Sequence, residues 1–190
     1  TGDYATLPHS LDWDVFASGS VFTLEAWIRF NTVPVDEVTY ADFFTQAEDG
    51  SNAWRFGYDQ STDQGGGLWI WMKSGGSTVV DFSTYYGTSG GQINDTDWHH
   101  VAMTKNGDDY LAWLDGTKVI DGSDASSDTF SAPLGLGGLL NTNAMFDGCM
   151  DEVRITRSLK YTAASPPVPA SLTTAFKDDK DTVLLMHMDG

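Results

Sequence analysis

Residues 98–122, WHHVAMTKNGDDYLAWLDGTKVIDG, constrain the fold more than any other segment of the chain. Asn106-Gly107 and Asp115-Gly116 each lie between runs in which apolar and polar residues alternate. Both dipeptides favour type I′ turns, because the two central residues of such a turn need positive φ. The segment therefore predicts three antiparallel strands joined by two tight turns.

The same two-residue period recurs along the rest of the chain. In residues 21–31 every second side chain is apolar, which is typical of a strand with one buried face. Further strands are predicted at 53–59, 68–74, 77–84, 132–140, 148–156 and 182–188. The last of these is apolar at consecutive positions, so it is predicted to be buried on both faces. This many short strands with glycine-rich connections indicate an all-β sandwich or barrel.

The chain of 190 residues is predicted to form one domain, 1–190. Residues 164–179 contain several prolines, which do not fit a central strand. They are therefore predicted to be an extended connector to a closing strand at 182–188. Residues 157–161 are predicted to form a single helical turn.

Charge and composition exclude several classes of function. Ten Lys and Arg residues oppose 27 Asp and Glu residues, giving a formal charge of −17, so the chain repels nucleic acid. No apolar run approaches the ~18 residues that a membrane span needs. A single cysteine, Cys149, excludes an internal disulfide and a multi-cysteine zinc site.

Four sequence blocks resemble the laminin-G-like, concanavalin A-like jelly-roll superfamily. They are GDYATLP (2–8), FTLEAWIRF (22–30), residues 98–119 and FDGCMDEVRITRSLKYT (146–162). The resemblance implies two antiparallel sheets, one of them concave, and members that bind glycans near rim loops, sometimes with calcium. The chain is most similar to the version found in virion and tail proteins of bacteriophages. There a strand like LLMHMDG (184–190) usually opens a domain, whereas here it closes the chain. Three interpretations are open: the chain is one period of a longer array, the last strand fills the place of the missing first strand, or it adds to the sheet edge of a neighbouring subunit.

Two tryptophans are the candidate glycan-binding residues. Trp69 and Trp71 share one face of their predicted strand, while Leu68, Ile70 and Met72 make a more ordinary core face. Aromatic rings stack on the apolar faces of sugars. The alternative is that aromatic side chains such as these, and those at 54–58, fill the core.

Asp3 and Asp151 are the candidate calcium ligands, because the resemblance implies adjacent strands for the first and last blocks. Asp151 and Glu152 would point to opposite faces of a regular strand and cannot clamp one ion together. The alternative is that these two carboxylates pair with Arg154, with Arg157 or with backbone amides.

Catalytic groups are not predicted. Cys149 has acidic neighbours, which disfavour a thiolate, and it is predicted to be a buried small apolar residue. His99 and His100 are adjacent in a strand, so they would face opposite ways and not share a metal ion. The chain lacks the E-x-D-x-x-E run of related glycoside hydrolases, a G-x-S-x-G elbow and a phosphate-binding loop.

The sequence therefore predicts a non-catalytic structural and recognition module of a phage virion or tail appendage. It would bind cell-surface glycans, copies of itself or neighbouring virion proteins, and it would be virion-associated or extracellular. The alternative is a carbohydrate-binding module of a secreted bacterial enzyme or adhesin.

Overall fold

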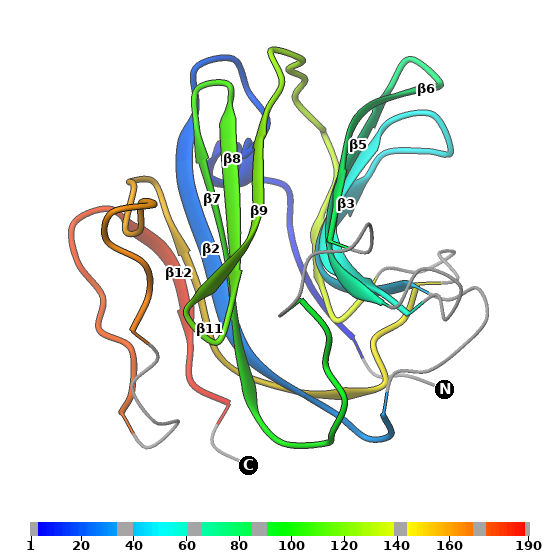
Figure 1. Cartoon of the computed structure of the whole chain (residues 1–190). Coiled ribbons are helices and arrows are strands. Elements are labelled where there is room, and N and C mark those ends of the chain that lie inside the picture. Colours follow the sequence, from blue (N-terminus) through cyan, green and yellow to red (C-terminus); the bar gives the residue numbers. More distant parts are fainter. Residues whose placement is uncertain are drawn as a thin grey trace.

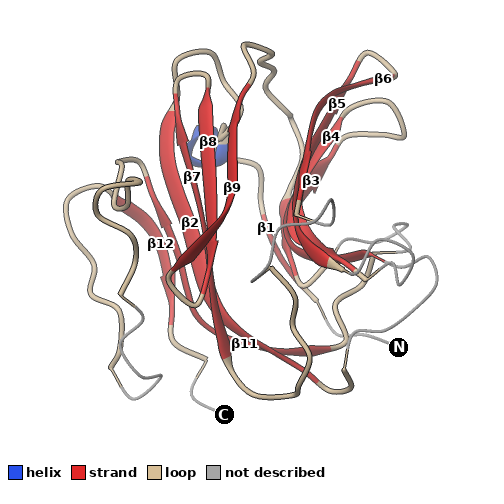
Figure 2. Cartoon of the chain, in the orientation of Figure 1, coloured by secondary structure: helices blue, strands red, loops and turns tan. Residues whose placement is uncertain are grey.

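The computed structural model describes residues 4–33, 40–60, 66–84, 91–138, 144–168 and 174–188. Within these residues two antiparallel sheets of six strands each face one another as the layers of a sandwich (Figure 1, Figure 2). The strands are β1 (Ala5–Leu7), β2 (Val21–Phe30), β3 (Tyr40–Ala47), β4 (Ala53–Asp59), β5 (Gly67–Ser74), β6 (Ser77–Ser83), β7 (His99–Asn106), β8 (Asp109–Leu114), β9 (Thr117–Ser123), β10 (Leu134–Leu136), β11 (Gly148–Thr156) and β12 (Thr182–Met186). A single turn of 3₁₀-helix, η1 (Leu11–Trp13), accompanies them, and no described helix is long and apolar enough to cross a membrane.

Each sheet is built from segments that lie far apart in the sequence. Sheet I has the strand order β1-β10-β3-β4-β5-β6, and sheet II has the order β12-β11-β2-β7-β8-β9. The chain passes repeatedly from one sheet to the other, as it does in a jelly roll. The predicted all-β sandwich of two antiparallel sheets is confirmed.

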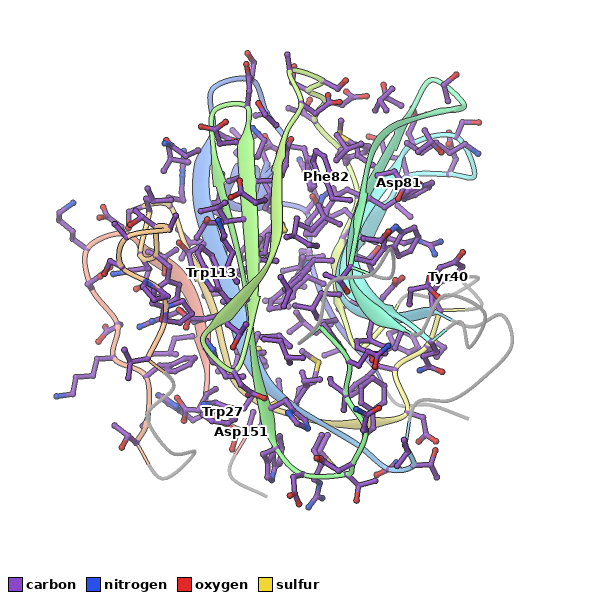
Figure 3. The ribbon with its side chains drawn as sticks, in the orientation of Figure 1. Trp27, Tyr40, Asp81, Phe82, Trp113 and Asp151 are labelled. Carbon is purple, nitrogen blue, oxygen red and sulfur yellow. The ribbon has the colours of Figure 1, made fainter. Side chains whose placement is uncertain are left out.

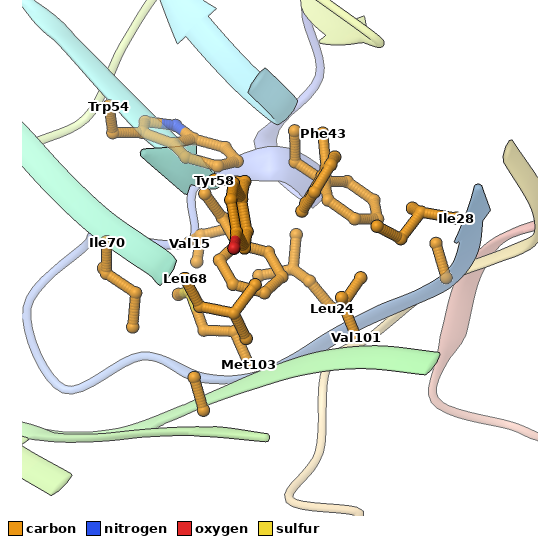
Figure 4. Packing of buried hydrophobic residues seen from close by; sticks show 14 of the residues in the cluster. Val15, Leu24, Ile28, Phe43, Trp54, Tyr58, Leu68, Ile70, Val101 and Met103 are labelled. Carbon is orange, nitrogen blue, oxygen red and sulfur yellow. The ribbon is translucent and has the colours of Figure 1, made fainter. Parts of the chain in front are cut away.

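The space between the sheets is filled by the side chains that alternation turns inward. From sheet II these include Leu24 and Ile28, and from sheet I they include Trp54 and Tyr58, all fully or almost fully buried (Figure 4). The ring of Phe30 meets Tyr58 edge-on, with their centroids 5.6 Å apart. Each such side chain contributes about 1.5–3 kcal/mol through burial, so this layer supplies most of the stabilisation of the fold.

Most of the predicted strands are confirmed, and the three-stranded segment forms as β7, β8 and β9. The second tight turn is the predicted one, because Asp115 and Gly116 both have positive φ, 50° and 79°. The first turn is placed one residue later than predicted. Asn106 pairs with Asp109, so the central residues are Gly107 and its successor, with Gly107 at φ 61°. A glycine in the first central position is typical of a type II′ turn.

Two local predictions are wrong, and two strands are missing from the prediction. β12 pairs with β11 alone and lies half-buried at the edge of sheet II, so it is not enclosed on both faces. Residues 157–161 form a bend rather than a helical turn. The strands β1 and β3 were not predicted, because YADFFTQA (40–47) carries no regular alternation and has a bulge between Asp42 and Phe44.

The outer face of sheet II is covered by the chain that follows β11. Tyr161 packs edge-on against Trp113 with 5.9 Å between ring centroids, and Phe176 packs against His100 at the same centroid distance. The guanidinium of Arg154 lies 4.6 Å from the ring centre of Phe176. This part of the chain leaves little of the sheet II face free.

Beneath this cover lies a fully buried carboxylate, Glu25. Its Oε1 accepts two hydrogen bonds from Arg154, at 2.8 and 2.6 Å, and its Oε2 accepts one from the Tyr161 hydroxyl and contacts His100 Nε2 at 3.1 Å. Burial acts to raise the pKa of Glu25, but these hydrogen bonds and the Arg154 charge outweigh it and hold the pKa below its usual value. The buried charge of Glu25 on the outer face of sheet II is thus compensated by Arg154 and by these hydrogen bonds.

The outer face of sheet I differs from that of sheet II in its curvature and in the side chains that it presents. Its strands curve so that the face turned away from sheet II is the concave one (Figure 1). The side chains on that face come from alternate positions of β3, β4, β5 and β6. This concave outer face is where the candidate site lies.

Gly57, in the middle of β4, sets how closely β3 can approach. A methyl group on Gly57 would lie 2.2 Å from the backbone oxygen of Ala41. We therefore expect Gly57→Ala to destabilise the fold by about 1–3 kcal/mol, measured by denaturant unfolding, as overpacked positions do. Gly50→Ala is the control, because a methyl group there meets no atom within 4 Å. Equal stabilities of the two variants would contradict this account of β4.

Candidate functional site

The candidate site begins with the two tryptophans of β5. Leu68, Ile70 and Met72 belong to the core cluster, so alternation turns Trp69 and Trp71 to the concave outer face of sheet I. The aromatic side chains of β4 at 54, 56 and 58 lie in the core instead. The face predicted for the two tryptophans is therefore the observed one.

A third ring extends the pair. Tyr40, from β3, stacks on Trp69 with ring centroids 4.4 Å apart and planes inclined by 23°, and the Trp69 centroid lies 5.7 Å from that of Trp71. Gly57 is directly opposite Trp69 on the strand between them, so no side chain separates the rings of β3 and β5. We call Tyr40, Trp69 and Trp71 the ring row; Tyr40 lies on the outer side of sheet I in Figure 3.

The three rings differ in how much of them is open to solvent. Trp69 is 7% exposed, because its neighbours in the row cover it, whereas Tyr40 and Trp71 are partly exposed. A ligand would therefore meet mainly Tyr40 and Trp71. Sequence reasoning missed Tyr40, since only the pairing of β3 with β4 brings it within reach of β5.

Polar groups fix the orientation of the ring row. The indole Nε1–H of Trp69 donates a hydrogen bond of 2.8 Å to the carboxylate of Asp81, which is exposed on β6 (Figure 3). The guanidinium of Arg55 lies 5.3 Å from the ring centre of Trp71, within the range of a cation–π contact. Rings held in this way need little reordering when a ligand stacks on them.

Asp42 is the unusual acid on this face. It is completely buried, it lies opposite Gly57, and neither carboxyl oxygen has a hydrogen-bond partner in the part of the chain that the structure describes. Its nearest cation is Arg55, whose Nε lies 3.7 Å from Oδ2. Burial raises the pKa of Asp42 to about 7, although the Arg55 charge acts in the opposite direction. Strongly perturbed acids of this kind are enriched at functional sites.

Of the two calcium candidates, Asp3 and Asp151, the structure describes one. Asp3 lies outside the described residues. The Oδ1 of Asp151 accepts backbone hydrogen bonds from Glu152 at 2.7 Å and from Met188 at 2.9 Å. Among the described residues, no group of three or more histidine, cysteine or acidic side chains lies close enough to hold a metal ion.

The predicted alternation at Asp151 and Glu152 is wrong. A bulge interrupts β11 between Asp151 and Arg154, and Glu152 adopts a φ of 51°. The carboxylate of Glu152 consequently contacts His187 Nδ1 at 2.6 Å, next to the residue that Asp151 binds. Both acids therefore reach the segment that follows β12, and the alternative of pairing with backbone amides describes Asp151 better than pairing with arginine.

The remaining candidates form no catalytic group with one another. His99 contacts Asp95 and Asp115, whereas His100 contacts Glu25, so the two rings diverge as predicted. Cys149 is not buried as predicted, because its pairing with Arg29 places it on the outer face of sheet II, where it is partly exposed. The Nη2 of Arg29 lies 3.6 Å from its sulfur.

Comparison with known families and structures agrees with this geometry. A family profile described as the concanavalin A-like lectin/glucanases superfamily, of laminin G type, matches residues 1–162. No curated protein sequence matches the chain. The sequence relationship is therefore visible at the level of the superfamily.

Several solved structures share the fold at low sequence identity. Domain 4 of an extracellular arabinanase from Geobacillus stearothermophilus, in complex with arabinotriose, has a TM-score of 0.56 and 19% identity over 80% of this chain and 66% of its own. A putative carbohydrate-binding protein from Bacteroides ovatus has a TM-score of 0.62 and 17% identity over 98% of this chain and 49% of its own. Tailspike protein 2 of an Escherichia coli O157:H7 bacteriophage has a TM-score of 0.58 and 12% identity over 84% of this chain and 22% of its own.

The raised pKa of Asp42 predicts a dependence of stability on pH. The folded protein keeps a proton up to about pH 7 that the unfolded chain releases near its ordinary value of 3.8. The favourable contribution of protonated Asp42 is thus complete below pH 4 and is lost as the pH rises to 7. Asp42→Asn cannot ionise, so its stability relative to the wild type should rise by a few kcal/mol between pH 4 and pH 8.

Chemical denaturation at several pH values measures this difference. Asp97→Asn, at an exposed position in the turn before β7, is the control and should follow the wild-type profile. Parallel profiles for the wild type and Asp42→Asn would show that Asp42 titrates normally.

Proposed function

Since the chain belongs to the concanavalin A-like lectin/glucanases superfamily, we propose that it is a non-catalytic module that binds a glycan on the ring row of sheet I. The ligand would stack on Tyr40 and Trp71, with Trp69 supporting both rings from between them. Asp81, which is exposed on β6, would accept a hydrogen bond from the ligand at the rim.

The observation that carries this proposal is the contiguous row of three rings on a concave face outside the core. A sugar ring presents C–H groups on one face and hydroxyl groups around its edge. An aromatic ring bordered by fixed polar groups complements both, because the ring removes apolar surface from water while the polar groups bind the hydroxyls. The concave curvature of sheet I lets neighbouring rings contact successive sugar units.

The comparisons support the class of ligand. The arabinanase domain is in complex with arabinotriose, and the Bacteroides ovatus protein is described as a putative carbohydrate-binding protein. Identities below 20% show a shared fold, so which sugar this chain binds is decided by its own ring row. This chain spans two thirds or less of the length of these structures, so the other activities of those whole proteins are not assigned to it.

The arrangement of acids favours binding over hydrolysis. A retaining glycosidase needs two carboxyl groups roughly 5 Å apart across the bond that it cleaves. Asp42 and Asp81 lie on β3 and β6, which are three strand steps apart, or roughly 14 Å at the usual strand spacing. Asp81 also accepts the Trp69 indole hydrogen bond, which suits a supporting role.

The net charge of −17 favours a neutral glycan at the ring row. An anionic polysaccharide would approach against the field of the whole molecule. Arg55, on the same face, is engaged by Trp71 and Asp42. A neutral oligosaccharide is therefore the expected ligand, and nucleic acid is not an expected partner.

The biological setting has two candidates. The similarity to a bacteriophage tailspike supports a recognition module of a phage virion or tail appendage, which would also contact copies of itself or neighbouring virion proteins. The similarity to an arabinanase domain supports the alternative, a carbohydrate-binding module of a secreted bacterial enzyme or adhesin. In both settings the module would be extracellular, either on a phage particle or in a secreted bacterial protein.

The ring row is tested by removing its most accessible tryptophan. Trp71→Ala should weaken binding to the neutral oligosaccharide selected on a glycan array by about five- to thirtyfold, since stacked rings contribute about 1–2 kcal/mol each. Trp98→Ala is the matched control, because Trp98 is also partly exposed and lies 5.2 Å from the guanidinium of Arg29, but it directly precedes β7 of the other sheet. Titration calorimetry of both variants decides the matter: equal affinities would contradict the ring row as the binding site.

Calcium bound by Asp3 and Asp151 stays a prediction. A bound ion stabilises the folded state by mass action, so a calcium chelator should lower the melting temperature. Asp151→Asn keeps an oxygen for the two backbone hydrogen bonds but loses the charge, and it should make the melting temperature insensitive to the chelator. If the chelator leaves the melting temperature of the wild type unchanged, the prediction of bound calcium is wrong.

A further inference from the structure

A second, polar pocket lies away from the ring row. It has a volume of about 470 Å³ and is lined by residues 11, 14 and 17–22, from the segment that leads into and begins β2, together with Arg157 just after β11. This segment, dark blue to blue in Figure 1, lies at the end of the sandwich next to the turn between β7 and β8. Its residues are all described, and none of them belongs to sheet I.

The wall of this pocket is held in place by backbone hydrogen bonds. Ser20 donates from its amide to Ala17 and from its hydroxyl to Val15, and its carbonyl accepts from the amide of Gly107. The buried ammonium of Lys105 donates to the carbonyls of Ala17 and Gly107. These contacts anchor the segment to the turn between β7 and β8, so the pocket is preformed rather than created by a loose loop.

The pocket brings together one cation and one anion that retain binding capacity. Arg157 is half-exposed, and toward the described residues its side chain makes a single hydrogen bond, from Nη1 to Asp12 Oδ1 at 3.3 Å. Exposed ion pairs of this kind contribute little to stability, so a ligand can compete for the guanidinium. The Oδ1 of Asp14 has no hydrogen-bond partner among the described residues, and burial raises the pKa of this carboxyl while the charges of His9 and Arg157 act against that rise.

The lining also offers hydroxyl and apolar surface. Ser18 is exposed beside the pocket, and Leu11 is 71% exposed, an unusual exposure for a large apolar side chain in a folded domain. A guanidinium binds a carboxylate through two parallel hydrogen bonds. A carboxylate such as Asp14 accepts hydrogen bonds from hydroxyl groups, and Leu11 can cover the apolar face of a sugar ring.

We propose that this pocket is a second binding site and that it takes a carboxylated sugar of the uronic acid class. The sugar carboxylate pairs with Arg157, its hydroxyl groups donate to Asp14 and contact Ser18, and its ring packs on Leu11. The site is independent of the ring row, and it differs in selecting an acidic rather than a neutral sugar.

The test uses glucuronate and glucose as probes of the whole chain at 0.15 M salt, followed by the amide NMR signals of Ser18 and Gly19. Glucuronate should shift these signals with saturation, and glucose should not. Arg157→Gln should raise the dissociation constant for glucuronate at least tenfold, and Arg29→Gln, at an exposed arginine outside the pocket, should leave it within twofold.

Several results would overturn the proposal. They are an absence of saturable shifts, equal responses to glucose and glucuronate, and unchanged affinity in Arg157→Gln. Saturation by alanine with no response to glucuronate would also overturn it, because the site would then select an amino acid. Trp71→Ala should leave glucuronate binding unchanged, which separates failure of this site from failure of the ring row.

Discussion

Each strand of this sandwich has two faces, and the use of one face limits the use of the other. The inner faces are consumed by the core, where side chains such as Trp54 and Leu24 are removed completely from water. The outer face of sheet II is then covered by Tyr161, Phe176 and the chain around them. The concave face of sheet I is the large surface left for a ligand, and the ring row lies there because Trp69 and Trp71 alternate with the core residues of β5.

Two buried acids show that the outer faces of the two sheets differ in how well buried charges are paired. Glu25 on sheet II has Arg154, Tyr161 and His100 as partners, and its pKa is lowered despite burial. Asp42 on sheet I has, among the described side chains, only a 3.7 Å contact with Arg55, and its pKa is raised to about 7. A buried polar group without partners costs free energy that the fold must supply elsewhere. Such a cost is expected at a surface that serves recognition rather than stability.

The fold could be predicted from the sequence because the alternation of apolar and polar residues and the residues that favour tight turns are both local features. The face of Trp69 and Trp71 followed from Leu68, Ile70 and Met72 alone. Tyr40 was not predictable, because it reaches Trp69 only through the pairing of β3 with β4 and the missing side chain at Gly57. The bulge at Glu152 could not be predicted either, because a single residue with positive φ does not change the pattern of apolar residues around it.

The acidity of the chain explains why its two candidate sites would divide sugars by charge. At about 0.1 M salt, repulsion is screened beyond about 10 Å, so an anion is admitted only by direct contact with an available cation. Arg55 at the ring row is engaged by a tryptophan face and by Asp42, which leaves stacking as the main attraction and favours a neutral sugar. Arg157 at the polar pocket pairs with Asp12 but is half-exposed, so a carboxylate can reach its guanidinium from solvent. A module with both sites could distinguish a mixed neutral and acidic polysaccharide from a purely neutral one.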